Sequence, residues 1–272
     1  MVEPGGRSGR YSISRRVGEV ERLALQNAVL APETDHLLDR IGVGAGWTCL
    51  DLGCGPGGIT GALSARVGPG GRVTGLDYDP VFVETAAQAA AANTNFITGN
   101  AYATGLPGAS FDLVHMRFIG STAGEPDRLV AEARRLVRPG GFVAAQEADF
   151  ATLACFPPDP AWATLVAAFR GCFPWTASDP EAHQVYRLMR AAGLEGVGYR
   201  PVLVGVRSSD PWIDYLPSTV ESLRPSIIAR GLLTDEALDT ALEACRAHLA
   251  APDTIFTSFT VVQTWGRLPP VV

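Results

Sequence analysis

A run of glycines follows a short buried-strand pattern and is preceded by an acidic side chain. Residues 48–52 (TCLDL) are predicted to form a strand, and the glycine-rich run 53–58 (GCGPGG) follows directly. Where such a run joins a strand to a helix, it lets the backbone approach a ligand, and the helix N-terminus turns its N–H groups toward that ligand. Many nucleotide-binding proteins carry this pattern, so alone it predicts either a ligand cradle or a plain strand-to-helix turn.

The carboxylate of Asp51 separates two classes of ligand for this cradle. A dinucleotide would place its pyrophosphate there, and repulsion from Asp51 would cost about 1 to 4 kcal/mol, depending on screening. S-adenosylmethionine has no phosphate at this point, and the ammonium of its methionine end can bind Asp51 directly or through water. Asp51 therefore favours the sulfonium cofactor over a dinucleotide.

Further positions extend the predicted cofactor site. Asp77 ends the next predicted strand, where a carboxylate can bind both ribose hydroxyls, and Tyr78 offers a flat face to the adenine. Asn100 and Ala101 follow the third predicted strand and can reach the adenine edge. The predicted cofactor is S-adenosylmethionine, and the rest of its predicted site consists of Gly53, Cys54, Gly55 and Met116.

Two later strands end in side chains that can serve a methyl transfer. His115, Met116 and Arg117 end the fourth predicted strand, and Glu147 and Asp149 end the fifth. Alignment of the two reactants can supply about 7–11 kcal/mol of such a displacement, and an acceptor protonated at neutral pH also gains from a general base. His115 is the predicted base, with a packed histidine as the alternative, and Glu147 is predicted to orient the substrate or to cap a helix.

Aromatic residues of the second half predict an apolar acceptor pocket. They lie in segments 151–178 and 208–252, and packing of these segments against the sheet is the alternative explanation for them. The aromatic candidates are Phe156, Trp162, Phe169, Phe173, Trp175, Trp212 and Tyr215. The predicted acceptor pocket also includes Arg117, Asp149 and His183.

The N-terminal region supplies a candidate lid. Tyr11 is a third candidate catalytic residue and, with Arg22 and Gln26, could fold over the cofactor. Because Glu19 shares a helical face with Arg22 and Gln26, an exposed polar stripe is the alternative. His183 shares a helical face with two arginines, which also fits a solvated surface.

The elements that must position these residues alternate between strand and helix. A helix is predicted from about residue 14 and a second, short one over 32–41. The following strands are predicted at 48–52, 72–76, 95–98, 111–116 and 142–146, with helices between them. This spacing predicts parallel βαβ units with right-handed crossovers. Later strands at 197–206 and 254–265 flank a helical excursion and are expected to pair antiparallel at the sheet edge.

Composition excludes several functions. All 22 basic residues are arginine, so chemistry that needs a lysine amine, as in phosphate-loop NTPases, pyridoxal enzymes and protein kinases, is excluded. A net charge of −6 disfavours nucleic acid as a partner. Five scattered cysteines without a C-x-x-C pair predict neither a metal site nor disulfides and fit a cytoplasmic protein.

No apolar run approaches membrane-spanning length. The mean hydropathy of +0.13 is compatible with buried contacts in a homo-oligomer. The chain is expected to form a single domain over 1–272, with an N-terminal extension at 1–40 and helical cap insertions at 151–178 and 208–252.

Together the motifs resemble those of the class I S-adenosylmethionine-dependent methyltransferases. They are D-L-G-C-G-P-G at 51–57, G-L-D at 75–77 and R-L-V-R-P-G-G at 135–141, and residues 11–26 resemble the N-terminal region of bacterial small-molecule methyltransferases. The resemblance implies a Rossmann-like, doubly wound α/β sheet of seven strands in the order 3-2-1-4-5-7-6. Its last strand is antiparallel, and N-terminal helices and a helical cap are added. Family members commonly carry Asp where this chain has Asn100, whose amide can still meet the adenine edge.

The resemblance implies methyl transfer to a small-molecule acceptor, such as a natural product or other secondary metabolite. The Asn-Pro-Pro-Tyr signature of nucleic-acid amino-methyltransferases is missing from the sequence. One alternative is a catalyst on the same fold that retains the cofactor and accelerates a cyclisation or rearrangement. A nicotinamide-dependent oxidoreductase is the other, and Asp51 argues against it.

Overall fold

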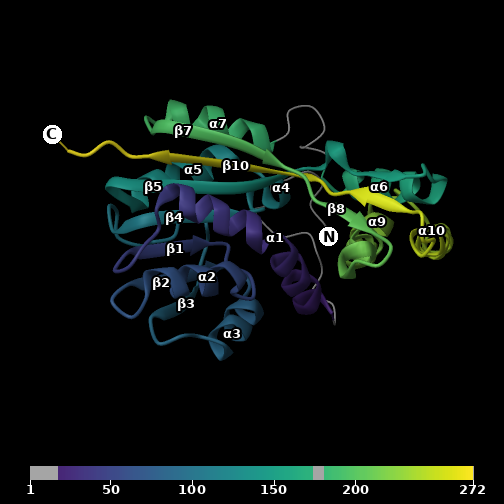
Figure 1. The fold of residues 1–272 in the computed structure, drawn as a ribbon, viewed down its shortest axis with the longest axis horizontal. Coiled ribbons are helices and arrows are strands. Elements are labelled where there is room, and N and C mark those ends of the chain that lie inside the picture. Colours follow the sequence, from purple (N-terminus) through teal and green to yellow (C-terminus); the bar gives the residue numbers. More distant parts are fainter. Residues whose placement is uncertain (1–17, 174–180, 272) are drawn as a thin grey trace.

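A seven-stranded sheet carries the fold in the part of the chain that the computed structural model describes, residues 18–173 and 181–271 (Figure 1). Its strand order is β3-β2-β1-β4-β5-β10-β7. In that order the strands span Thr94–Thr98, Arg72–Asp77, Thr48–Leu52, Phe111–Arg117, Val137–Asp149, Thr260–Arg267 and Glu195–Val202. Strands β1 to β5 pair in parallel, and β10 is antiparallel to both of its neighbours. The predicted fold class and strand order are confirmed.

Helices cover both faces of the sheet. On one face, α5 (Pro126–Leu136) packs against β4 and β5, and α7 (Glu181–Ala191) packs against β5, β10 and β7. On the other, α1 (Glu19–Ile41) and α2 (Gly58–Val67) pack over β1 and its neighbours, and α3 (Pro80–Gln88) lies against β2 and β3. Strands buried on both faces have nearly continuous apolar sequences, which is why the central strands could be located from the sequence.

The N-terminal part of the described chain is one helix where two were predicted. Helix α1 runs through Pro32, which lacks the N–H that would otherwise bond to the carbonyl of Ala28. Leu30, Leu37 and Leu38 on its buried face are fully packed against the rest of the protein on both sides of the proline. This tertiary packing outweighs one missing hydrogen bond, so the prediction of a separate helix at 32–41 is wrong.

A second, three-stranded sheet was not predicted. It consists of β6 (Ala154–Phe156), β9 (Ile255–Thr257) and β8 (Gly205–Arg207), with β9 antiparallel to both others. The predicted single strands 197–206 and 254–265 are therefore each divided. Both divide at a junction where the Ser258 N–H donates to the carbonyl of Val204 (2.9 Å) and the Ser258 hydroxyl accepts from the Val204 N–H (3.0 Å).

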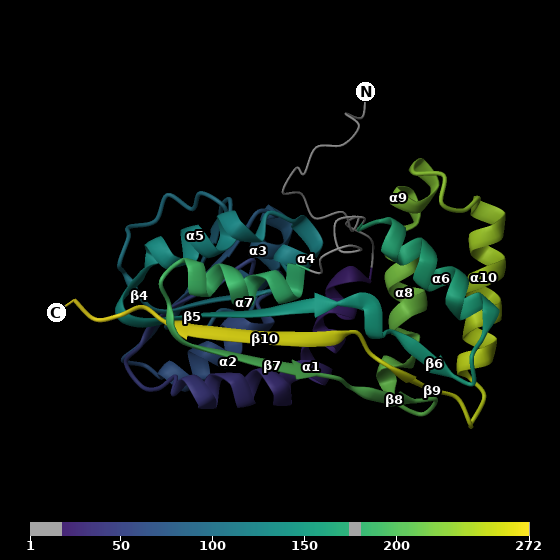
Figure 2. The same ribbon diagram turned by 90° about the horizontal axis from the view of Figure 1, so that it is seen from above.

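Four helices gather with this small sheet at one end of the main sheet (Figure 2). They are α6 (Pro160–Gly171), α8 (Tyr215–Ser222), α9 (Arg224–Ala229) and α10 (Asp235–Leu249), and they share one hydrophobic core. We call this group, with the short 3-10 turns at Phe150–Thr152 and Pro211–Asp214, the cap.

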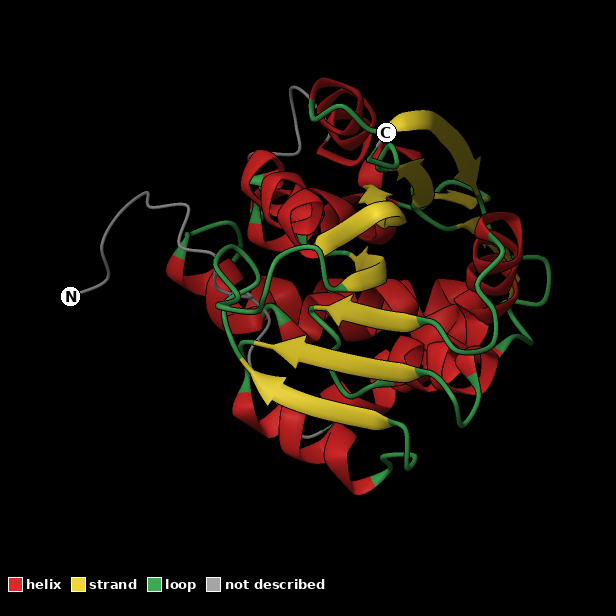
Figure 3. Cartoon of the chain, turned by 90° about the vertical axis from the view of Figure 1, so that its left-hand side faces the viewer, coloured by secondary structure: helices red, strands yellow, loops and turns green. Residues whose placement is uncertain are grey.

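The parallel strands all end at the edge of the main sheet that the cap adjoins. Figure 3 shows the arrowheads of neighbouring strands aligned at one edge. A four-residue helix, α4 (Gly120–Ala123), follows β4 at the same edge. In open parallel sheets, ligands bind beyond the carboxyl ends of the strands, so this edge is where a site is expected.

Candidate functional site

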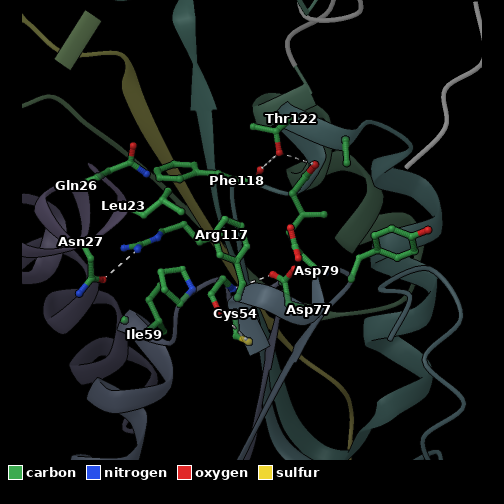
Figure 4. Close-up of a pocket in the computed structure, with 18 of the residues that line it drawn as sticks. Leu23, Gln26, Asn27, Cys54, Ile59, Asp77, Asp79, Arg117, Phe118 and Thr122 are labelled. Atoms are coloured by element: carbon green, nitrogen blue, oxygen red, sulfur yellow. Dashed lines mark hydrogen bonds between the residues drawn. The ribbon is translucent and has the colours of Figure 1, made fainter. Parts of the chain in front are cut away.

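A cavity of about 1000 Å³ lies at the carboxyl ends of β1, β2 and β4 (Figure 4). Its wall comes from α1, from the loop of residues 53–58 (the glycine loop), from the loops after β2, β3 and β4, and from the cap. Single ligand pockets usually measure about 300–1000 Å³. The cavity is therefore large enough for a cofactor together with a second small molecule.

The glycine loop forms the floor of the cavity and is shaped by two constraints. The N–H groups of Gly53 and Cys54 both donate to the carbonyl of Leu76, at 2.7 and 3.0 Å, which holds the loop against β2. Gly53 has a φ of 73°, and a Cβ at this position would come within 2.4 Å of the Ile119 side chain. Gly55 has a φ of 52° and open space beside it. The backbone is thus exposed to a ligand at a point where a side chain would be strained.

Asp77 presents a fixed carboxylate to the cavity at the end of β2. One of its oxygens accepts from the N–H of Gly55 (2.8 Å) and the other from the N–H of Asp79 (2.9 Å). Each oxygen keeps a lone pair for a ligand. Burial raises the pKa of Asp77 above its ordinary value, against the opposing effect of these two bonds.

The loops after β2 and β3 form a flat, partly aromatic part of the wall. Tyr78 is 57% exposed, and Phe82 and Tyr102 also line the cavity. Asn100 accepts from the N–H of Tyr102 through its side-chain oxygen (2.9 Å), which leaves its amide N–H groups for a ligand. Ala101 completes this part of the wall.

Most of the predicted cofactor residues are brought together in this cavity. They are Asp51, Gly53, Cys54, Gly55, Asp77, Tyr78, Asn100 and Ala101, and with Arg117 they form what we call the polar end. Met116 is the exception among the predicted residues. Its side chain is buried in the core under α5 and does not contribute to the wall, so its assignment is corrected. Side chains alternate along β4, and only one of two neighbours can face a given side of the sheet.

Asp51 is held by two neighbours. The hydroxyl of Thr60 donates to one carboxylate oxygen (2.7 Å), and the Nδ1 atom of His115 lies 3.3 Å from the other. His115 is fully buried on β4, directly opposite Asp51 in the strand register, and does not line the cavity. On its far side, Nε2 lies 3.1 Å from the amide nitrogen of Gln146.

A row of buried polar side chains fixes the proton on His115. It crosses the sheet through Asp51, His115, Gln146, Gln263 and Arg200, and we call it the polar ladder. Arg200 can only donate, so the Gln263 side-chain oxygen must accept from it (2.9 Å). The Gln263 amide nitrogen then donates to the Gln146 oxygen (3.1 Å) and to the backbone carbonyl of Glu33 (2.7 Å).

The same assignment of donors and acceptors extends along the polar ladder to Asp51. Because the Gln146 oxygen faces Gln263, its amide nitrogen faces His115 and donates to Nε2. Nε2 of His115 is therefore the acceptor, and its Nδ1–H donates a hydrogen bond to the Asp51 carboxylate. With both ring nitrogens engaged inside the sheet, His115 cannot take a proton from an acceptor, and the prediction that it is a general base is corrected.

Glu147 caps a helix and does not reach the cavity. Its carboxylate is buried and accepts from the N–H groups of Gly120 (3.0 Å) and Ser121 (2.9 Å) and from the Ser121 hydroxyl (2.8 Å). Burial raises the pKa of Glu147 despite these bonds. Glu147 was predicted either to orient the substrate or to cap a helix, and in the structure it caps the start of α4.

Several residues predicted for acceptor binding lie outside the cavity wall. Phe156 is 49% exposed on β6, and Trp212 is packed inside the cap. Asp149 pairs with His183 (3.2 Å), whose other ring nitrogen lies 3.0 Å from the Tyr199 hydroxyl, away from the wall. These assignments are corrected, because β6, the end of β5, the 3-10 turn at Pro211–Asp214 and α7 direct these side chains away from the cavity wall. Tyr11 and Trp175 lie outside the described residues.

Aromatic side chains that belong to the cap core, or pack against it, form another part of the cavity wall. Phe150 makes edge-to-face contacts with Phe169 (4.6 Å between ring centroids) and Phe259 (5.7 Å). We call this wall the aromatic end, and it consists of Phe118, Phe150, Phe169, Phe173, Tyr215 and Phe259. Phe169, Phe173 and Tyr215 were predicted from the sequence. The other three were not predicted, and each of them directly follows a strand or a strand junction.

Polar residues of α1 border the aromatic end. Arg22 pairs with both carboxylate oxygens of Glu19 (2.7 and 2.9 Å) and lies 3.3 Å from the Gln26 oxygen and 3.4 Å from the Thr219 hydroxyl of α8. Arg22 and Gln26 line the cavity, and Glu19 is buried. The alternative of an exposed polar stripe on this helix is wrong.

Two further properties of the described residues bear on function. No group of three or more His, Cys, Asp or Glu side chains among them could hold a metal ion. Across 18–173 and 181–271, no helix combines the length and the hydropathy of a membrane-spanning segment.

Sequence comparison relates the chain to methyltransferases. A family model described as "Methyltransferase domain" matches residues 50–145. The demethylmenaquinone methyltransferase of Staphylococcus aureus is 32% identical over 188 residues, which cover 63% of this chain and 77% of the relative. An uncharacterized 37.1 kDa protein from a transposon of Streptomyces fradiae is 31% identical over 164 residues. That match covers 58% of this chain and 46% of the relative, so the chain spans less than half of its length.

Structural comparison shows the same fold in distant proteins. The YcgJ protein of Bacillus subtilis has a TM-score of 0.57 at 20% identity, over 87% of this chain and 99% of that one. Phosphoethanolamine N-methyltransferase 2 of Haemonchus contortus, in complex with phosphomonomethylethanolamine and S-adenosylhomocysteine, has a TM-score of 0.57 at 16% identity. That match covers 96% of this chain and 60% of the other.

Proposed function

Because the chain belongs to the class I S-adenosylmethionine-dependent methyltransferases, we propose that it methylates an apolar small molecule, such as a natural product or other secondary metabolite. The observation that carries this proposal is the division of one cavity into a polar end and an aromatic end. The polar end matches the cofactor of the family, and the aromatic end leaves room for an apolar acceptor.

The polar end fits S-adenosylmethionine group by group. The fixed Asp77 carboxylate has free lone pairs for the two ribose hydroxyls. Tyr78 provides a face for the adenine, and the Asn100 amide provides donors for its edge. One oxygen of the Asp51 carboxylate accepts a hydrogen bond from His115 and the other accepts one from Thr60, which holds the carboxylate in place to accept from the ammonium of the methionine end.

When bound, S-adenosylmethionine supplies an activated methyl group. The residues of this chain then have to position the acceptor and exclude water, and such alignment is worth about 7–11 kcal/mol. Phe150, Phe169 and Phe259 pack edge to face and form a water-poor surface for a flat acceptor. Arg22 and Gln26 offer hydrogen-bonding groups for its polar substituent.

Titration calorimetry and a product assay test this proposal. The purified protein should bind S-adenosylhomocysteine and not NAD. With a panel of phenols, quinols and apolar amines, it should release S-adenosylhomocysteine together with a product heavier by one methyl group, detected by mass spectrometry. Binding of NAD alone would contradict the proposal. A converted acceptor without release of S-adenosylhomocysteine would instead identify the cofactor-retaining alternative.

A further inference from the structure

Arg117 carries a partly buried positive charge without an ion-pair partner in the described part of the chain. It ends β4, and Figure 4 shows its guanidinium between α1 and the glycine loop. Its Nη2 donates to the side-chain oxygen of Asn27 (3.0 Å), and its Nη1 is shielded from solvent and has no partner in the described part of the chain. No carboxylate there lies within ion-pair distance of it. A guanidinium in this state is costly to bury, and a ligand anion would compensate it.

The charge on Arg117 persists at neutral pH. Burial lowers the pKa of Arg117 to about 10, and the negative charge of Asp51 works in the opposite direction. Asp51 is thus near enough to attract the guanidinium, although the two side chains are not in contact. Both line the same end of the cavity.

Two other donor groups lie at the same corner. The oxygen of Asn27 is occupied by Arg117, so its amide N–H groups are the part left for a ligand. Asn27 also packs on Gly58, where a Cβ would come within 2.6 Å of the Asn27 Cγ. Gly58 begins α2, a ten-residue helix that has no side-chain cap and no acidic residue in its first turn. The positive end of α2 and the guanidinium therefore face the same small volume.

This corner presents a cation and an anion side by side, which is the complement of an amino-acid zwitterion. We propose that Arg117, with Asn27 and the first turn of α2, binds the α-carboxylate of the methionine end of the cofactor. Asp51 then receives the α-ammonium. The proposal rests on the proposed function, and it moves Arg117 from the acceptor pocket, where the sequence analysis placed it, to the cofactor site.

Two ligands that differ at the methionine end test the assignment. S-adenosylhomocysteine carries the amino-acid group, and 5′-methylthioadenosine lacks it. Calorimetry on Arg117→Gln should show affinity for S-adenosylhomocysteine lowered about 10- to 100-fold, the size expected for one charged hydrogen-bonded pair. Affinity for 5′-methylthioadenosine should change less than twofold. Arg117→Lys should recover part of the loss, because it restores the charge.

A matched control and the alternative outcomes keep the test decisive. Arg66→Gln removes a guanidinium of α2 that already pairs with Asp35 and Asp39 outside the cavity, and it should change neither affinity. An equal loss for both ligands in Arg117→Gln would show a merely structural role and overturn the proposal. An unchanged affinity for S-adenosylhomocysteine with a raised KM for the acceptor would overturn it in favour of the acceptor pocket. Failure of the unmodified protein to bind either ligand would instead contradict the proposed function.

Discussion

The two ends of the cavity are built from different parts of the chain. The polar end comes mainly from residues 51–117, in loops that follow successive parallel strands. The aromatic end combines side chains from the segments that follow β4 and β5, from α6 and the residues after it, from α8 and from the junction between β9 and β10, which are up to about 140 residues apart in sequence. The first end is a product of local backbone geometry and fixed charges. The second is produced by tertiary packing.

This difference predicts different responses to mutation. At the polar end, the side chains make specific hydrogen bonds that no neighbouring group can take over. Substitutions there should therefore lower cofactor affinity. At the aromatic end, side chains offer surface and shape, so substitutions should act on acceptor turnover and leave the cofactor affinity nearly unchanged.

The largest effect is expected for Asp77→Ala. In the proposed cofactor site the substitution would remove two charged hydrogen bonds to the ribose, each worth about 1.5–3 kcal/mol. Calorimetry should show affinity for S-adenosylhomocysteine lowered by about 100-fold or more. Asp127→Ala, at an exposed position in the first turn of α5, is the control. Unchanged binding by Asp77→Ala would show that this end of the cavity has been misassigned.

Phe150→Leu should produce the opposite pattern. The smaller side chain leaves a gap between Phe169 and Phe259, and kcat/KM for the acceptor should fall about tenfold, as expected for roughly 1.4 kcal/mol of lost positioning. Affinity for S-adenosylhomocysteine should stay within about twofold. Phe156→Leu, on the exposed surface of β6, is the matched control. A large loss of cofactor affinity in Phe150→Leu would erase the proposed distinction between the two ends.

Acid should weaken the polar end selectively. The carboxylate of Asp77 is the form that accepts from ribose, and its pKa is raised by burial above the ordinary value of 3.8. Affinity for S-adenosylhomocysteine should therefore begin to fall, as the pH decreases, at a higher pH than an exposed Asp would allow. Asp77→Asn should flatten that part of the pH profile. A profile that is identical in both proteins would exclude Asp77 as the titrating group.

The smallest functional effect is expected for His115→Asn. The imidazole is a positioning group for Asp51, so cofactor affinity should fall only a few-fold. Thermal unfolding should show a loss of about 1–3 kcal/mol, because buried partners lose their bonds. The shape of the pH profile of kcat should not change. Loss of a titration from that profile would restore His115 as a base.

The sequence was sufficient for most of the polar end, Arg117 excepted, because the rules that place its residues are local. A carboxylate before a glycine run and another at the end of the next strand specify both the turn and the ligand groups, and Asp51 and Asp77 line the cavity as expected. The regular alternation of strands and helices predicted the parallel βαβ units, and the strand order came from the resemblance to the class I methyltransferases.

The features that were not predicted depend on contacts between residues that are far apart in the sequence. Phe150 and Phe259 have the same apolar character as any core phenylalanine, and nothing local marks them as cavity residues. The hydrogen-bonding state of His115 follows from Arg200, three strands away in the polar ladder. The continuity of α1 through Pro32 depends on what its buried face contacts. None of these could be obtained from sequence spacing.

The small sheet has a consequence for how this enzyme can diversify. The excursion that carries α8, α9 and α10 leaves from β8 and returns at β9, and these two strands are hydrogen-bonded to each other. Insertions or deletions between them need not shift β7 or β10, because loop closure costs grow only slowly with length. Under the proposed function, changes in the segment between β8 and β9 can therefore alter the acceptor side of the cavity, to which α8 contributes Tyr215, while the polar end stays unchanged.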